Sequence, residues 1–326
     1  MAEATIARKN EAAARILAAT LTLISREQKT LPPPFSLWTP PMGAKEIKEA
    51  ALAVASGGAQ VIWVEESHPA RGLALLQRQE IESELLGGGA GRLKGPFLVD
   101  PEASSRQEKT FSLATKAKWL AKGLSYRFLS VKSVHDPAII RGYNEAGFQA
   151  AEITTRLGGP IAPADPQSLG TLKNPGVTLA RAQGGEGARL LKGLGDLFYD
   201  GHYLHGPSLP PDFSRRLWAK VAEEALTRGD LALFALDPRA GEPVGLALAS
   251  QNGAEAYLLI LHVAEEKRRE GLGRFLLLNL LSELWRAGAR TLKAETASWN
   301  LPALSLYLGV GLKPAASLVA LHHALN

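Results

Sequence analysis

The strongest signal in the sequence is the segment VAEEKRREGLGR at residues 263–274, in which residues 268–273 fit the pattern R-x-x-G-x-G. It lies between a run of β-formers, EAYLLILHV at residues 255–263, and an apolar helical run, RFLLLNLLSELWRAG at residues 274–288. Successive backbone N–H groups at a helix N-terminus bind anions, and the helix dipole favours negative charge there. Glycines let the backbone approach a pyrophosphate, and arginines add charge-assisted hydrogen bonds. The segment therefore predicts a phosphate-binding loop.

Two other interpretations of this loop compete with phosphate binding. The first is a solvated charged turn whose glycines only bend the chain; the strand before it and the apolar helix after it disfavour that reading. The second is a dinucleotide-binding fingerprint, which has a third glycine and a βαβ unit near the start of its domain. Neither feature is present here.

The same loop resembles the acetyl-CoA pyrophosphate loop of the GNAT superfamily of N-acetyltransferases, which usually reads V-x-P-x-x-R-G-x-G-I-G-x-x-L. Here Glu265 replaces the proline and Arg269 the first glycine. A second segment, NLPALSLYLGVGL at residues 300–312, is similar to the superfamily pattern N-x-x-A-x-x-x-Y-x-x-x-G-F, with Leu312 for phenylalanine. The expected element order from residue 177 onward, β-α-α-β-β-β-α-β-α-β, extends the resemblance over the C-terminal half.

The resemblance implies an α/β fold with a mixed sheet of the α+β kind and acetyl-CoA as the acetyl donor. Tyr307 would protonate the departing CoA thiolate, and the strand backbone near residues 261–263 would hold the pantetheine amides like an added strand. The implied cofactor-binding residues are Leu261, Val263, Arg268, Arg269, Glu270, Gly271, Leu272, Gly273, Arg274, Asn300 and Ala303. Two purely structural alternatives stay open: Tyr307 is an aromatic residue packed in the core, and Asn300 is a helix N-cap.

A general base must take a proton from the substrate's ammonium group before the amine attacks, and His262 is the residue that we expect to do so. It lies on the strand that leads into the loop, where a histidine can titrate near neutral pH. A packed or solvent-facing histidine is the alternative. Further candidates are Glu255, Glu295, His202 and His205. We expect no metal, because His322 and His323 are adjacent on a strand, point to opposite faces and have no third ligand in view.

The two halves of the chain are related by an internal repeat with a constant offset, 300 − 136 = 307 − 143 = 311 − 147 = 164. The equivalent pairs are Asp136 and Asn300, Tyr143 and Tyr307, and Gly147 and Gly311. At the same offset, Gln107 and Lys109 stand opposite Gly271 and Gly273, in a segment without glycines that we expect to form a loop. The first copy is therefore expected to keep part of the fold and to have lost cofactor binding, unless the similarity arose by chance.

Three regions follow from this organisation. Residues 1–45 are expected to form an N-terminal helix and a Pro-rich arm, residues 46–165 a degenerate GNAT-like domain, and residues 177–326 the complete acetyltransferase domain. A loop rich in Pro and Gly at residues 158–176 separates the halves. This tandem arrangement, with the fragment ESELLG at residues 82–87, resembles bacterial dTDP-fucosamine N-acetyltransferases and suggests an amino-sugar nucleotide as acceptor.

Composition limits the remaining function classes. The chain has 326 residues, 46% of them hydrophobic and 21% charged, with a net charge of +5, which suits a globular protein and does not indicate nucleic-acid binding. No apolar run is long enough to span a membrane, and the N-terminal stretch favours an amphipathic helix over a signal peptide. Cytoplasmic location follows by default, without a membrane partner; a homo-oligomer stays open.

The absence of cysteine excludes disulfides, thiolate metal sites and a cysteine nucleophile. Acetyl transfer is then expected by direct attack of a primary amine on acetyl-CoA in a ternary complex, with a small-molecule amine as acceptor. Two alternatives remain: acetylation of a protein or peptide amine, and a non-catalytic protein that binds acyl-CoA.

Overall fold

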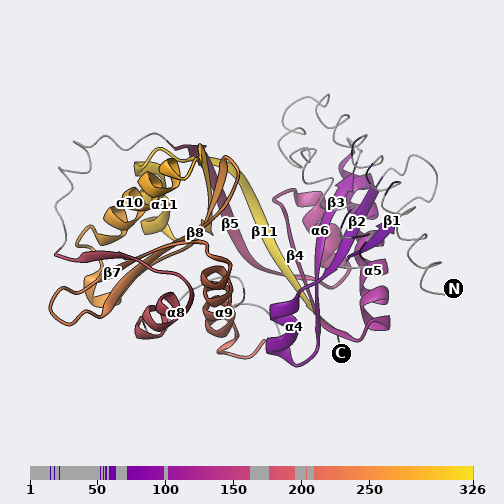
Figure 1. Cartoon of the computed structure of the whole chain (residues 1–326). Coiled ribbons are helices and arrows are strands. Elements are labelled where there is room, and N and C mark those ends of the chain that lie inside the picture. Colours follow the sequence, from indigo (N-terminus) through magenta and orange to yellow (C-terminus); the bar gives the residue numbers. More distant parts are fainter. Residues whose placement is uncertain are drawn as a thin grey trace. The chain divides into compact units, whose positions relative to one another are not determined.

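The computed structural model describes residues 59–63, 72–98, 102–161, 176–194 and 209–325, together with residues 15, 18, 22, 52, 54, 56 and 203. The chain forms two compact units (Figure 1). The first unit comprises Met1–Ile153, His202–Pro210 and Ala316–Asn326, and the second comprises Thr154–Gly201 and Pro211–Ala315. No helix in the described residues is long and apolar enough to cross a membrane.

The sheet of the second unit has the strand order β5-β10-β9-β8-β7-β6. The strands are β5 (Gln149–Pro160, in this unit from Thr154), β6 (Thr178–Arg181), β7 (Leu231–Leu236), β8 (Pro243–Asn252), β9 (Glu255–Val263) and β10 (Thr291–Ala297). Neighbouring strands are antiparallel except β9 and β10, which are parallel. A parallel pair needs a crossover connection, and the phosphate loop and its helix supply it here.

Helices cover both faces of this sheet, because side chains alternate along each strand. On β8, Leu246 and Leu248 pack into one core with α8 (Gly184–Gly193) and α9 (Phe213–Arg228). Ala247 and Ala249 pack into the other core, with α10 (Leu272–Arg286) and α11 (Leu301–Gly309). We call these the α8–α9 face and the α10–α11 face.

The sheet of the first unit has the order β1-β2-β3-β4-β11. Its strands are β1 (Ala59–Trp63), β2 (Gly72–Arg78), β3 (Gly89–Leu98), β4 (Tyr126–Val134) and β11 (Lys313–Ala324, in this unit from Ala316). The helices are α4 (Glu80–Leu86), α5 (Ala103–Gly123) and α6 (Pro137–Glu145). Its core lies between the sheet and helices α5 and α6, as Leu113, Ala117, Ile139 and Leu129 illustrate.

The last strand of each repeat pairs within the other unit. Thr154–Pro160 of β5, from the first repeat, pairs with β10 in the second unit. Leu318–Ala324 of β11, from the second repeat, pairs with β4 in the first unit. The compact units therefore interleave the ranges 46–165 and 177–326, whose status as domains stays a prediction. The N-terminal arm falls outside the described residues, except that Arg15, Ala18 and Thr22 are helical.

The helix and strand bounds reproduce the offset of the repeat. Helix α6 at residues 137–145 corresponds to α11 at 301–309, and β5 at 149–160 corresponds to β11 at 313–324, because 301 − 137 = 309 − 145 = 313 − 149 = 324 − 160 = 164. One expectation was wrong. The segment opposite the phosphate loop is helical from Ala103, so Gln107 and Lys109 lie in α5. The stretch ASSRQEK contains no glycine to interrupt a helix, and Ala, Arg, Gln, Glu and Lys favour one.

Candidate functional site

Strands β9 and β10 pair at their beginnings and then diverge. β9 pairs with β8 up to Val263, whereas its pairing with β10 covers only Glu255–Tyr257 against Thr291–Lys293. A β-bulge interrupts the β8–β9 register around Leu259, and bulges increase local strand twist. From Leu258 onward, β9 therefore lacks a ladder partner on its β10 side within the described range 209–325. Leu261 and Val263 lie on this open stretch.

The loop after β9 presents a row of free backbone N–H groups. A short 3₁₀ turn, η1 (Glu265–Lys267), is closed by the hydrogen bonds of Lys267 N to Ala264 O and of Arg268 N to Glu265 O. The first helical bond of α10 is donated by Phe275 N to Gly271 O, 3.0 Å away. Between them, the N–H groups of residues 269–274 donate to no acceptor among the described residues. They provide the donors that a pyrophosphate requires at a helix N-terminus.

Two residues of the loop have left-handed backbone conformations. Gly271, the N-cap of α10, has φ 85°, and Arg269 has φ 66°. A Cβ added at Gly271 would meet no atom within 4 Å, so the loop is open on that side and its backbone angle is what requires glycine. Arg269 stands where the superfamily usually has glycine, and a non-glycine residue in this conformation costs about 1–2 kcal/mol.

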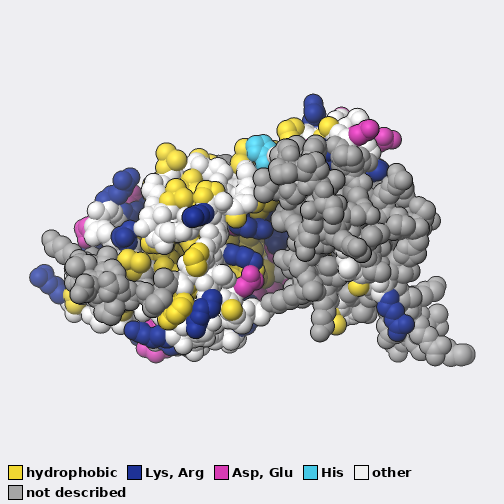
Figure 2. Space-filling view, turned by 90° about the horizontal axis from the view of Figure 1, so that it is seen from above, with side chains coloured by type: hydrophobic (Ala, Val, Ile, Leu, Met, Phe, Trp, Pro, Cys, Tyr) yellow, Lys and Arg dark blue, Asp and Glu magenta, His cyan; other side chains and the backbone are white. Residues whose placement is uncertain are grey.

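The predicted arginines differ in their contacts. Arg268 donates from Nε to the carbonyl of Val263 at 3.0 Å, and Arg274 donates from Nη1 to the carbonyl of Gly309 at the end of α11, at 3.3 Å. Arg269 and Glu270 are exposed, and their side chains bond to no described residue. Seen from above, the second unit has Lys and Arg side chains among hydrophobic ones (Figure 2). Most guanidinium donors of the loop therefore remain available to an anion.

Asn300 is the N-cap of α11. Its Oδ1 accepts a hydrogen bond from the backbone N–H of Ala303 at 3.2 Å, and a proline occupies the first turn of the helix. The capping interpretation is thus confirmed, and Ala303 uses its N–H in that cap. A cofactor contact for either residue stays a prediction, which for Asn300 would use the side-chain amide nitrogen.

Tyr307 combines a buried ring with an uncommitted hydroxyl. The residue is 6% exposed and packs in the core of the α10–α11 face. No described residue forms a hydrogen bond with its hydroxyl. Burial raises the pKa of Tyr307 to about 12, so the phenol is protonated at neutral pH and can act as a proton donor.

His262 lies on the opposite face of the sheet from Tyr307. Its strand neighbours Leu261 and Val263 pack toward the α10–α11 face, whereas Ile260 belongs to the core of the α8–α9 face. Burial, followed by the charge of Arg268, lowers the pKa of His262, so the imidazole is neutral at neutral pH. A neutral imidazole can accept a proton. The two catalytic candidates therefore lie on opposite faces of the sheet, and His262 belongs to the stretch of β9 that is not paired with β10.

The other described candidates for the base are held in ion pairs. Glu255 Oε1 lies 3.0 Å from Lys293 Nζ, at the end of β9 far from the loop. Glu295 Oε1 lies 2.6 Å from Arg156 Nη2. Glu295 follows the last β9–β10 pair and, because Leu292 and Ala294 belong to the other core, faces the same side as His262.

Sequence reasoning missed Arg156, which reaches Glu295 from β5 of the first repeat. No local pattern signals a pairing between strands so far apart in sequence. His202 and His205 lie outside the described residues. Among the described residues, no group of His, Asp and Glu side chains is arranged to hold a metal ion.

The equivalent place in the first unit is filled by the protein itself. Tyr143 donates its hydroxyl hydrogen bond to the carbonyl of Gly95 at 3.1 Å. A buried ion pair of 2.9 Å joins Arg106 of α5 to Asp136, the N-cap of α6. A Cβ added at Gly142 would lie 2.5 Å from the carbonyl oxygen of Gln107, so α6 packs directly on α5. These contacts leave the first repeat without the free tyrosine and open loop of the second.

A mixed sheet with a diverging parallel pair, followed by a glycine loop with free N–H groups, defines the acyl-CoA N-acyltransferase class of α/β fold. Residues 198–311 match the Acetyltransferase (GNAT) family, and the chain carries a GNAT acetyltransferase domain there. No functionally curated protein matches the sequence.

Solved structures extend the likeness over both repeats. A tandem GNAT protein from the clavulanic acid biosynthesis pathway is 16% identical, with a TM-score of 0.60 and coverage of 95% of each chain. A GCN5-related N-acetyltransferase from Sphaerobacter thermophilus is 16% identical, with a TM-score of 0.64, over 97% of this chain and 94% of that one. The architecture is therefore that of tandem GNAT proteins. The narrower resemblance to dTDP-fucosamine N-acetyltransferases stays a prediction.

Proposed function

We propose that this protein is an acetyl-CoA-dependent N-acetyltransferase that acetylates the primary amine of a small molecule by direct attack. The observation that carries the proposal is the row of free N–H groups at residues 269–274, placed at the N-terminus of α10 beside the open edge of β9. An extended arm ending in a diphosphate fits both features, because a strand edge binds amides and a helix N-terminus binds anions.

In this proposal, some residues of the second unit bind acetyl-CoA and others transfer protons. Acetyl-CoA, when bound, supplies the thioester that the amine attacks. The loop N–H groups hold the diphosphate, and β9 from Leu258 onward holds the pantetheine amides. Tyr307, protonated and without a competing partner, gives the proton that the leaving group needs. His262, neutral on the α8–α9 face, takes the proton of the amine, and Glu295 is the second candidate there.

This division places donor and acceptor on opposite faces of the sheet. The loop, α10 and α11 lie on one side, whereas His262 and Glu295 face α8 and α9 on the other. We therefore assign cofactor binding to the α10–α11 face and the amine acceptor to the α8–α9 face. An amino sugar is the first acceptor to test, given the resemblance at residues 82–87.

Calorimetry with CoA tests the binding site through a matched pair of glycines. Gly271 and Gly241 both have positive φ, and a Cβ added at either would meet no atom within 4 Å. Gly271→Val and Gly241→Val should therefore strain the backbone similarly, but only Gly271 lies in the loop. We expect Gly271→Val to lose CoA binding and Gly241→Val to retain it. Equal loss in both variants, or no CoA binding by the wild-type protein, would refute the assignment.

Release of free CoA thiol then identifies the acceptor. Because the chain contains no cysteine, a thiol reagent reports only the product. Glucosamine, an amino-sugar nucleotide, spermidine and a short peptide with a free N-terminus make up the first panel. Turnover with the peptide alone would favour a protein N-acetyltransferase. CoA binding without turnover of any amine would indicate a non-catalytic acyl-CoA-binding protein.

A further inference from the structure

Tyr203 lies in the connection between α8 and α9, yet its side chain is part of the first unit. The connection spans residues 194–212, between two helices that cover the proposed acceptor face of the second unit. Tyr203 is assigned to the first unit and is only 4% exposed. Tyr203 therefore belongs to the first unit, although the helices before and after it in sequence, α8 and α9, belong to the second.

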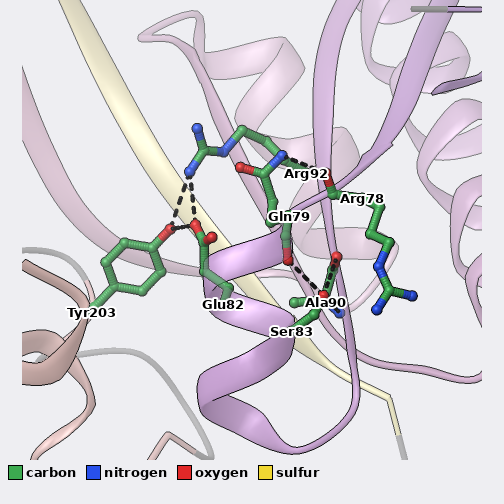
Figure 3. Close-up of polar contacts among 7 residues, drawn as sticks. All are labelled: Arg78, Gln79, Glu82, Ser83, Ala90, Arg92 and Tyr203. Atoms are coloured by element: carbon green, nitrogen blue, oxygen red, sulfur yellow. Dashed lines mark hydrogen bonds and ion pairs between the residues drawn. The ribbon is translucent and has the colours of Figure 1, made fainter. Parts of the chain in front are cut away.

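The hydroxyl of Tyr203 joins Glu82 and the partly exposed Arg92 in a triad of hydrogen-bonded side chains in the first unit (Figure 3). It donates to Glu82 Oε1 at 2.9 Å, while Arg92 Nη2 donates to the Tyr203 oxygen at 3.2 Å and to Glu82 Oε1 at 3.1 Å. The Tyr203 ring stacks on His322 of β11, with centroids 5.4 Å apart. A buried carboxylate such as Glu82 requires such partners, because an unpaired charge is costly to desolvate. Tyr203 thus supplies one of the hydrogen bonds that the buried carboxylate of Glu82 requires.

Glu82 and Arg92 lie on two elements, α4 and β3, that are joined by further hydrogen bonds. Glu82 lies on α4, and the next residue, Ser83, accepts a hydrogen bond at Oγ from Ala90 N of β3 at 2.9 Å. Gln79 N donates to Ala90 O at 2.9 Å, so the start of α4 is tied to the strand that carries Arg92. Figure 3 shows Glu82 and Arg92 pointing toward Tyr203 from these two elements. Preorganisation of this kind reduces the entropy cost of holding a chain segment.

We propose that Glu82, Arg92 and Tyr203 form a latch through which the degenerate first unit holds the α8–α9 connection and so sets the affinity for the amine acceptor. Tyr203 and Glu82 are positioning residues in this proposal, since neither is part of the donor site. The inference about the acceptor rests on the proposed function. It gives the first repeat a role that does not need a cofactor.

The test compares two tyrosines that each lose one buried hydroxyl in the first unit. Tyr203→Phe keeps the ring on His322 but removes its bonds to Glu82 and Arg92. Tyr143→Phe removes the bond to Gly95 and has no link to the connection. Losing a buried hydrogen-bond partner should speed local opening by about tenfold or more. We expect faster amide hydrogen exchange of residues 194–212 in Tyr203→Phe but not in Tyr143→Phe.

Kinetics with the amine from the panel that is acetylated supply the second readout. Tyr203→Phe should raise its KM by about tenfold, with kcat and the CoA dissociation constant nearly unchanged. The latch is refuted if exchange of residues 194–212 stays at the wild-type rate, or if Tyr143→Phe raises it equally. Its role for the acceptor is refuted if CoA affinity falls together with amine affinity. The exchange experiment needs no acceptor, so it judges the latch even if the acetyltransferase proposal fails.

Discussion

Tyr307 and Tyr143 occupy equivalent positions of the repeat, 164 residues apart, and their hydroxyl groups have opposite surroundings. Tyr143 is tied to the carbonyl of Gly95, whereas Tyr307 is buried around its ring and has no hydrogen-bond partner among the described residues. A hydroxyl already bonded to the backbone is a structural group. A protonated hydroxyl without such a bond is available to donate a proton, which is why we propose Tyr307 as the general acid.

Replacing Tyr307 by Phe should lower kcat by about 10²–10⁴, because it removes the proton donor and keeps the ring that packs in the core. CoA affinity and the melting temperature should change little. Steady-state kinetics with calorimetry check this, and Tyr143→Phe serves as the control with unchanged kcat. An unaltered kcat in Tyr307→Phe would reduce this residue to a packing role.

The lowered pKa of His322 predicts that the stability of the first unit depends on pH. It is fully buried, and burial, followed by the charge of Arg92, lowers its pKa to about 4. Below pH of about 6.5 the unfolded chain protonates this histidine and the folded chain does not, so the free energy of unfolding should fall by at most about 3 kcal/mol toward pH 4.

Urea unfolding at about pH 7 and about pH 4.5 measures this effect in the wild type and in His322→Phe. The variant keeps an aromatic ring beside Phe128 but cannot titrate, so it should lose less stability on acidification. Equal losses in the two proteins would assign the acid sensitivity to other groups.

The equivalent helix pairs of the two repeats differ at the place where we propose that the second repeat binds acetyl-CoA. In the first unit α5 begins early at Ala103, packs against α6 at Gly142, and is joined to it by the Arg106–Asp136 ion pair. In the second unit the corresponding stretch before α10 remains a loop with a left-handed glycine. Inside a helix, the backbone N–H groups donate hydrogen bonds to the carbonyl groups of the same helix. In this loop, the N–H groups have no such acceptor among the described residues.

Calorimetric titration should therefore give a stoichiometry of about one CoA per chain, because the first unit provides no open loop. Gly271→Val should abolish this binding altogether, since no second site takes over. A stoichiometry of about two, or residual binding in Gly271→Val, would show that the first repeat has kept its own site.

At the scale of the whole molecule, the exchanged strands make each unit depend on both repeats. β10 is covered on one side by β5 from the first repeat, and β4 is covered by β11 from the second. Removing a strand from a sheet leaves an edge of unpaired N–H and C=O groups that promotes aggregation. The acetyltransferase domain predicted at residues 177–326 therefore lacks one strand of its own sheet.

A fragment of residues 177–326 should be poorly soluble and should not unfold cooperatively. A longer fragment of residues 149–326 restores β5 beside β10 and should be more soluble, although β11 still lacks β4. Soluble yield and thermal unfolding followed by circular dichroism compare the two with the whole chain. If residues 177–326 melt cooperatively at the temperature of the whole chain, β5 is dispensable and this account is wrong.

Local patterns predicted much of the molecule. The loop at residues 268–273, the capped helix beginning after Asn300, the element order from residue 177 and the offset of the repeat all follow from residues close together in sequence. The start of α5 was missed, because the alignment with the phosphate loop outweighed a stretch of good helix formers. The face of His262 was not predicted, since it depends on the bulge near Leu259 and on which helices cover which side.

By itself, the sequence determined the resemblance to GNAT acetyltransferases, the glycine loop before α10 and the offset of the repeat, because glycine placement, capping and periodicity act over a few residues. Only the tertiary structure decided that β5 and β11 exchange units, that Arg156 meets Glu295, and that Tyr203 is buried against Glu82. These pairings join residues more than a hundred positions apart. Their energy comes from burial and strand pairing in three dimensions, for which no local pattern in the chain carries a signature.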